Sequence, residues 1–259
     1  MPAHDLPLLL DAAHRAADIA RRHFQAKPEV WDKGGGQGPV TEADLEVDRM
    51  LKATLLSARP GYGWLSEETD DSVARLDCAR VFIIDPIDGT RSFVDGSKTF
   101  AHSLAIAEQG RVVAAVVYLP LRDMLYSAGL GQGATLNGKP LRHSGREGLD
   151  QARVLAARPQ LAPDLWPGGV PPVDRHFRPS LAYRLGLVAE GRFDAMVTLR
   201  DAWEWDIAAG ALICQEAGVA VSDRTGAPLI FNNPTPKHPG VLAGAPLIHA
   251  GLLRHLSAG

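Results

Sequence analysis

A short apolar run that ends abruptly at acidic residues constrains this chain most. Residues 81–84 read VFII, and residues 85–90 that follow at once read DPIDGT. Four consecutive apolar residues indicate a strand buried on both faces, and we expect it to stop at Asp85-Pro86 because proline has no N–H for a ladder. The chain should therefore form a buried sheet whose edge carries a turn with two carboxylates, Asp85 and Asp88.

Periodicity on both sides of this strand predicts a mixed α/β (α+β) fold with layered sheets. Apolar residues at helical spacing indicate an amphipathic helix over 5–24, and Thr41 is a candidate N-cap for a second helix. A β-meander is expected over 102–107, 111–119, 123–128 and 133–136, with Asn137-Gly138 as a hairpin turn. After this meander the chain is loop-rich over 145–178.

The second half then alternates helix and strand. The expected elements are a helix over 180–190, a strand over 194–199, a helix over 206–217 and a strand over 219–222. We therefore predict two subdomains, an N-terminal one over 1–145 with most of the acidic signals and a C-terminal one over 146–259.

Charge and cysteine content exclude several classes of protein. The formal net charge is −3 over 259 residues, so no long-range positive field attracts a nucleic-acid polymer. Cys78 and Cys214 lie in no CxxC pair, which argues against a disulfide framework or a thiolate zinc site. No apolar run approaches the ~20 residues that span a bilayer, and no signal-peptide pattern opens the chain. These features predict a protein of the reducing cytoplasm, without a membrane partner.

Carboxylates concentrate in one window of the chain. Residues 41–95 hold twelve acidic and six basic side chains, so this window alone carries −6. Taken singly, its acidic pairs are explained by turns and helix ends. Together, carboxylates at successive strand ends repel one another unless a cation offsets them, and oxygen ligands select hard cations such as Mg²⁺ or Mn²⁺. The joint pattern favours a metal site.

Five features in a fixed order resemble one known family. They are Asp44, Glu67-Glu68, the DPIDGT run 85–90, the WDIAAG run 205–210 and the EAG run 216–218. In this order they resemble the inositol monophosphatase superfamily of lithium-sensitive, Mg²⁺-dependent phosphatases, over about residues 5–250. The resemblance implies a layered αβαβα sandwich of the sugar-phosphatase type, and a protein that is commonly a homodimer.

The resemblance also implies a set of metal ligands. Glu67, Asp85 and the Ile87 carbonyl would hold a first Mg²⁺, and Asp85, Asp88 and Asp206 would hold a second. A third, weaker ion near Glu67 is common in the family. Lithium sensitivity would follow from the second site.

Catalytic and phosphate-binding roles are implied in the same way. Glu67 and Thr90 would activate the attacking water, with Asp44 hydrogen-bonded to Thr90. The backbone N–H groups of Gly89 and Thr90 would contact the phosphate, and Lys33 matches a basic residue near the outermost metal. The reaction would be direct in-line hydrolysis without a phosphoenzyme.

The leaving alcohol is less well defined by the sequence. Residues 197–200 read VTLR where inositol-specific enzymes often carry a Glu, and residues 179–181 read PSL where the family has a Gly-Thr-Ala-like stretch. Arg200 is thus either a ligand for a second phosphate or a solvated strand-end residue. Trp203 and Trp205 either stack on a substrate or pack.

Several functions remain open at this point. Besides inositol monophosphatase activity, the family includes enzymes that act on 3'-phosphoadenosine 5'-phosphate, histidinol phosphate and fructose 1,6-bisphosphate. A haloacid-dehalogenase mechanism is disfavoured, because it needs two aspartates two residues apart. A non-enzymatic alternative is a partner-binding protein of an RNA-processing or transcription complex, but the sequence displays no basic or apolar docking face. We interpret His102, His143 and His176 as structural.

Overall fold

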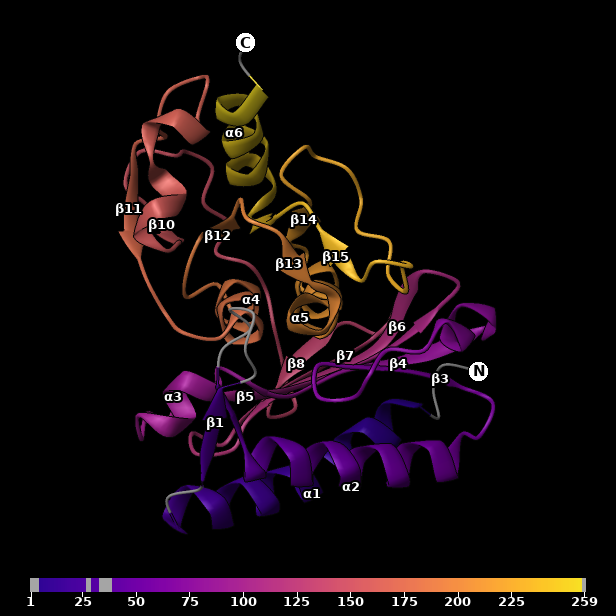
Figure 1. Cartoon of the computed structure of the whole chain (residues 1–259). Helices are drawn as coiled ribbons and strands as arrows, with labels where there is room; N and C mark the ends of the chain where they lie inside the picture. The colour runs from indigo at the N-terminus through magenta and orange to yellow at the C-terminus, as the bar shows by residue number, and fades with distance from the viewer. Residues whose placement is uncertain (1–4, 27–28, 33–38, 258–259) are drawn as a thin grey trace.

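Five layers of secondary structure make up the molecule. In this computed structural model, which describes residues 5–26, 29–32 and 39–257, helices α1 (Asp5–Ala26) and α2 (Glu42–Ala58) form the first layer. A seven-stranded sheet, helices α4 (Leu181–Ala189) and α5 (Glu204–Glu216), a five-stranded sheet and helix α6 (Pro246–Ser257) follow in order (Figure 1). The predicted αβαβα sandwich is confirmed.

The seven-stranded sheet begins with a parallel pair and continues as a meander. Its order is β3-β4-β5-β6-β7-β8-β9. The strands are β3 (Gly63–Ser66), β4 (Arg80–Asp88), β5 (Ala101–Glu108), β6 (Arg111–Leu119), β7 (Met124–Gly129), β8 (Ala134–Leu136) and β9 (Lys139–Pro140). Only β3 and β4 pair in parallel. Asn137 and Gly138 join β8 to β9 with φ of 50° and 77°, the left-handed turn that these two residue types favour.

One face of this sheet is covered by α1 and α2. The alanine-rich stripe of α1 and the Leu51 and Leu55 side chains of α2 pack against Phe82 and Ile84 of β4. Thr41 caps α2 as predicted, since its side chain accepts from the Asp44 N–H while the Asp44 carboxylate accepts from the Thr41 N–H. Both helices therefore hold the face of the sheet opposite the candidate site.

Helices α4 and α5 are enclosed between the two sheets. Every residue of α4 is buried, and Arg184 is its only charged residue. The helices approach closely at Gly210, where an added Cβ would lie 2.5 Å from a Leu185 side-chain carbon. The pair thus behaves as one packed unit that contributes to both cores.

The second sheet has the order β11-β10-β12-β16-β14 and is covered by α6. Its strands are β10 (Ala152–Leu155), β11 (Val173–His176), β12 (Ala195–Thr198), β14 (Ala220–Ser222) and β16 (Val241–Gly244). The expectation of loop over 145–178 is incomplete, because β10 and β11 lie in that stretch. Each has only four residues and is flanked by prolines and short 3₁₀ turns, which hide the strand signal.

Several short elements complete the fold over the described residues. They are the pairs β1 (Val30–Asp32) with β2 (Pro39–Thr41) and β13 (Ala202–Trp203) with β15 (Lys237–His238), helix α3 (Thr90–Val94), and three 3₁₀ turns: η2 (Val73–Asp77), η3 (Arg158–Leu161) and η4 (Pro163–Leu165). Across the part of the chain that the structure describes, no helix is long and apolar enough to cross a membrane. The division into subdomains near residue 145 stays a prediction.

Candidate active site

The parallel pair β3–β4 brings two carboxylates to the same sheet edge. Ser66 pairs with Ile84 in register, so Glu67 and Asp85 are the next residue of each strand. The Glu67 N–H donates to the Ile84 carbonyl at 3.2 Å, which extends the ladder by one bond. Because parallel strands end at the same edge, these two side chains become neighbours.

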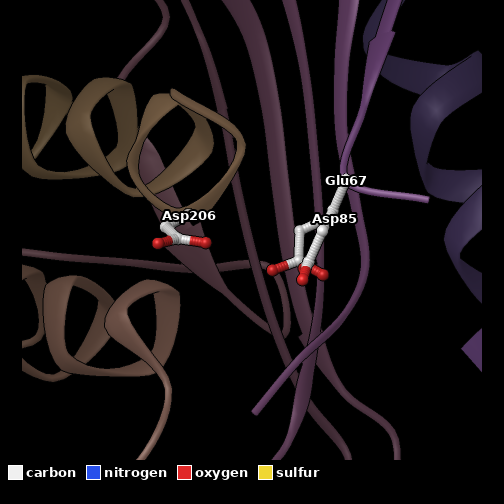
Figure 2. A group of neighbouring side chains, drawn as sticks. All are labelled: Glu67, Asp85 and Asp206. Carbon is white, nitrogen blue, oxygen red and sulfur yellow. The ribbon is translucent and has the colours of Figure 1, made fainter. Parts of the chain in front are cut away.

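A third carboxylate comes from the first turn of α5. Asp206 faces Glu67 and Asp85 across the edge of the sheet (Figure 2). One carboxylate oxygen from each of the three residues lies within 4.8 Å of the others. The Ser103 hydroxyl of β5 donates to the Trp205 carbonyl at 2.9 Å and so ties the start of α5 to the sheet.

Asp85 lies in a setting that suits a cation. Its side chain is buried, and its Oδ1 accepts from the Ile87 N–H at 3.0 Å. Its Oδ2 has no hydrogen-bond partner among the described residues. Burial, together with the charges of Glu67, Asp88 and Asp206, raises the pKa of Asp85 well above its usual value. A buried oxygen without a donor, facing two further carboxylates, fits a hard divalent cation.

A β-bulge follows Asp85 and corrects the prediction that the strand stops at Asp85-Pro86. Asp85 pairs with Ser103 and Asp88 with Ala101, so Pro86 and Ile87 together lie opposite His102. The bulge accommodates a proline because the extra residue is excluded from the ladder. Strand β4 therefore continues to Asp88, and Gly89 then takes φ of 98° to start α3. A residue with a side chain would be strained at that φ.

Thr90 and Asp44 form a buried pair behind this turn. The Thr90 hydroxyl lies 3.0 Å from Asp44 Oδ1 and 3.1 Å from the Ile87 carbonyl. Asp44 Oδ2 accepts from the N–H and the hydroxyl of Thr41 at 2.8 and 2.5 Å. Burial raises the pKa of Asp44 to about 6, against the lowering effect of these hydrogen bonds. Asp44 thus serves both as the capping-box residue of α2 and as the acceptor for Thr90.

Asp88 lies outside the group of three carboxylates. Its Oδ2 accepts from the Ser180 hydroxyl at 2.6 Å and from the Ala182 N–H at 2.7 Å, at the start of α4. Burial raises the pKa of Asp88 to about 6, and the nearby Arg184 charge opposes that rise. Ser180 itself adopts φ of 65°, a conformation that non-glycine residues adopt at an energetic cost. Asp88 is therefore tied to the start of α4 by two hydrogen bonds.

The predicted site residues line one hollow. A cavity of about 300 Å³ is bordered by Glu67, Asp85, Asp88, Thr90 and Arg200, and also by Ile87, Gly89, Ser180 and Asp206. Asp44 lies behind it. Lys33 falls outside the described residues.

A second hollow of about 580 Å³ shares Glu67, Arg200 and Asp206 with the first. Trp203 and Trp205 line it and stack with ring centroids 4.5 Å apart. Lys237 Nζ lies 3.8 Å from the centroid of the Trp203 ring, on which it forms a cation–π contact. The two tryptophans therefore pack on each other and also border an open space beside the carboxylates.

Several positioning contacts were not anticipated from the sequence. The Ser66 and Thr69 hydroxyls donate to the two oxygens of Asp48 at 2.5 and 2.6 Å, and so fix the segment that carries Glu67. Glu204, fully buried, accepts from the backbone N–H groups of Asn232 and Asn233 at 2.6 and 2.9 Å. The spacing of Asp44 and Asp48, four residues apart on one helix face, was the only sequence signal for any of these contacts.

Comparison with known proteins places the chain in a family. A sequence profile described as the inositol monophosphatase family matches residues 4–258. This chain belongs to that family. An inositol-1-monophosphatase of Rhizobium meliloti is 38% identical over 197 residues, which is 72% of this chain and 73% of the relative. The chain is therefore a phosphatase, a phosphoric monoester hydrolase.

Two further relatives carry a different name. The Nus factor SuhB of Escherichia coli K12 is 32% identical over 232 residues, 85% of each chain. The crystal structure of the extragenic suppressor protein suhB of Bartonella henselae superposes with a TM-score of 0.81 at 31% identity, over 98% of both chains. The comparisons as a whole support the phosphatase and do not favour the alternative phosphatases or the partner-binding role.

Proposed function

We propose that this phosphatase hydrolyses a small phosphate monoester with Mg²⁺, or Mn²⁺, bound by Glu67, Asp85 and Asp206 together with the Ile87 carbonyl. The observation that carries the proposal is the convergence of three carboxylates, one of which, Asp85, has a buried Oδ2 without a hydrogen-bond partner among the described residues. Three negative charges at such separations repel one another strongly in a buried setting. A divalent cation removes that repulsion, and two or three ions are expected in the loaded site.

A bound divalent cation would lower the pKa of a water molecule and neutralise charge that develops on the phosphate. Glu67 and Thr90 would orient and deprotonate that water. A hydroxyl carries one proton, and donation to an ionised Asp44 is stronger than donation to the Ile87 carbonyl. Thr90 would therefore donate its hydrogen bond to Asp44. The lone pairs of the Thr90 oxygen would then face the water, and the Ile87 carbonyl would stay free for the cation.

The phosphate is expected at the start of α3. Gly89 and Thr90 would offer backbone N–H groups there, and the missing Cβ at Gly89 keeps the approach open. Asp88 would join Asp85 and Asp206 around a second ion through the oxygen that Ser180 and Ala182 do not occupy. Lys33 stays a predicted contact of the outermost ion.

The second hollow is the proposed site for the leaving alcohol. The stretch 197–200, where the family resemblance leads us to expect an acid, holds none, and its Leu199 side chain is buried and offers no acceptor to ring hydroxyls. Arg200 follows it, is exposed and lines both hollows. Among the described residues it forms no ion pair that would occupy its charge. An alcohol that carries a second anionic group is therefore the favoured substrate class, with inositol 1-phosphate as the reference substrate.

A substrate panel tests this proposal. Phosphate release with Mg²⁺ is to be compared, by kcat/KM, among inositol 1-phosphate, 3'-phosphoadenosine 5'-phosphate, histidinol phosphate, fructose 1,6-bisphosphate and 3-phosphoglycerate, with and without a chelator. Asp88→Asn should abolish turnover of all of them. Arg200→Gln should lower kcat/KM at least tenfold only for substrates with a second anionic group, which corresponds to about 1.4 kcal/mol. Lys237→Gln, which removes the same charge from a side chain held on Trp203, is the matched control.

The outcomes separate the parts of the proposal. A folded protein that releases no phosphate from any member, with or without metal, would refute the proposed function. Activity that Arg200→Gln lowers equally for all substrates would refute only the second-anion site.

Three further properties follow from the family and stay predictions. A homodimer is expected and is tested by light scattering on the purified protein. Inhibition by Li⁺ in the millimolar range is expected from the second-ion site. A cytoplasmic location is expected because Cys78 and Cys214 are both free thiols, and is tested by cell fractionation.

A further inference from the structure

His102 contacts the metal-binding turn from the opposite face of the sheet. It lies on β5, next to Ser103, and successive residues of a strand point to opposite faces. Ser103 therefore reaches the α5 side, where it donates to the Trp205 carbonyl. His102 reaches the α1 side, where its Nδ1 lies 2.5 Å from the Pro86 carbonyl oxygen. Two adjacent residues of β5 thus hold two different ligand-bearing segments.

The contact replaces a ladder bond that the β-bulge removes. Pro86 and Ile87 lie together opposite His102, so the Pro86 carbonyl has no regular cross-strand partner. A carbonyl can only accept, so Nδ1 of His102 must carry the proton. His102 is fully buried, and burial lowers its pKa to about 4. The neutral ring therefore serves as a fixed donor to one backbone carbonyl.

The bond reaches Asp85 through a single rigid unit. The Pro86 carbonyl and the Ile87 N–H belong to the same planar peptide group. On one side the oxygen accepts from His102, and on the other side the N–H donates to Asp85 Oδ1 at 3.0 Å. Any rotation of this peptide would break both bonds together. Because the Ile87 N–H holds Oδ1, the peptide orientation also fixes the Asp85 carboxylate.

A histidine at position 102 lowers the stability of the fold, and packing alone does not call for it. His102 Nε2 is buried and has no hydrogen-bond partner among the described residues. A buried polar atom without a partner destabilises a fold, typically by about 1–3 kcal/mol, and an apolar side chain on β5 would avoid it. Asp85 Oδ2 also lacks a partner. The two unpaired atoms lie at the two ends of one hydrogen-bonded chain that leads to the candidate cation site.

We propose that His102 is a positioning residue for the cation site. It holds the Pro86–Ile87 peptide and, through this peptide, orients the Asp85 carboxylate that binds the cation. This inference rests on the proposed metal dependence and adds to it a residue that makes no contact with metal or substrate. It predicts that loss of the Nδ1 donor weakens metal binding even where the fold gains stability.

Two substitutions at His102 separate positioning from packing. His102→Leu removes the donor and the unpaired Nε2. His102→Asn keeps an N–H at the place of Nδ1. His249→Leu is the matched control, because His249 is also buried and forms one hydrogen bond, to the Ser222 hydroxyl at 2.8 Å, far from the turn.

The readouts are Mn²⁺ affinity by titration calorimetry and thermal unfolding of the metal-free protein. We expect His102→Leu to weaken Mn²⁺ binding about 10–100-fold, as for other residues that orient metal ligands, without a lower metal-free Tm. His102→Asn should restore binding to within a fewfold of the wild type. His249→Leu should lower Tm and leave Mn²⁺ affinity unchanged. Activity of His102→Leu should recover at high Mn²⁺.

Three results would overturn the inference. The first is wild-type Mn²⁺ affinity in His102→Leu, and the second is equal weakening in the Leu and Asn variants. His102→Val replaces His102→Leu if the latter does not fold. The third result is that neither of these variants folds while His102→Asn does, which would show that His102 serves the fold alone. A wild-type protein that binds no Mn²⁺ would instead refute the proposed metal dependence.

Discussion

Replacement of Asp85 by asparagine should stabilise the metal-free protein. The Asn side-chain oxygen can still accept from the Ile87 N–H, while its amide can donate to Glu67 or Asp206. The change thus removes one buried charge and gives the unpaired Oδ2 position a partner. Leaving a buried polar group unsatisfied costs about 1–3 kcal/mol. For a chain of this size each kcal/mol corresponds to about 2–4 °C, so Tm should rise by ~2–12 °C.

Bound metal should make the wild type more stable than Asp85→Asn. At a concentration 100 times its Kd, a cation that binds only the folded state adds about 2.7 kcal/mol of stability. The wild type should gain this stabilisation and Asp85→Asn should lose it, because one ligand charge is gone. The pKa of Asp85 is raised in the folded state, so the ionised side chain destabilises the metal-free wild type as pH rises above the usual pKa of an aspartate. The metal-free difference should therefore shrink on acidification.

The assay is thermal unfolding in a chelator and in excess Mg²⁺ or Mn²⁺, at pH 7 and at pH 5. Asp223→Asn is the control, since Asp223 is also buried but its Oδ1 accepts from the Thr225 N–H, the Thr225 hydroxyl and the Ala227 N–H at 2.7–2.9 Å. This control should lose stability and still respond to metal. A metal-free Asp85→Asn less stable than the wild type, or one that metal stabilises as much, would refute the reasoning.

Three further predictions concern the same site. Thr90→Val should lower kcat by about 10²–10⁴-fold with a small change in Tm, whereas Thr90→Ser should stay active. Equal loss of kcat in both variants would show that the hydroxyl has no role in catalysis. The pKa of Asp44 is about 6 in the folded state, so the metal-free protein should lose stability as pH rises from about 4 to 6, by up to about 3 kcal/mol from this residue; melts of Asp44→Asn over that range should show a flatter profile. Glu204→Gln should raise KM for substrate more than it lowers kcat, because the Asn232–Asn233 segment beside the second hollow loses one of its two buried acceptor oxygens; unchanged kinetics would show that this segment does not affect substrate binding.

Local patterns allowed much of the fold to be predicted. The apolar run 81–84, the Thr41 cap and the Asn137-Gly138 turn act through neighbours in sequence, and all three are confirmed. Strands β10 and β11 were missed, because four residues between prolines carry little periodic signal. The continuation of β4 past Pro86 was also missed, since only the pairing with β5 reveals the bulge.

In the candidate site too, local sequence patterns predict some features, whereas others depend on tertiary packing. That Glu67 and Asp85 share an edge follows from two parallel strands, but the approach of Asp206 depends on how α5 docks and came only from the family resemblance. His102 and Ser103 gave no sequence signal, because a hydrogen bond to a distant backbone carbonyl leaves no pattern along the chain. The sequence analysis predicts only a structural role for His102, and its hydrogen bond to the Pro86 carbonyl is seen only in the folded chain.

The order of the three carboxylates along the chain has a consequence for synthesis. Glu67 and Asp85 leave the ribosome well before Asp206, which joins them only when α5 docks between the two sheets. A cation that needs all three ligands therefore stabilises the finished tertiary structure and no earlier intermediate. Uptake of metal would then mark the moment at which the nascent chain completes its fold.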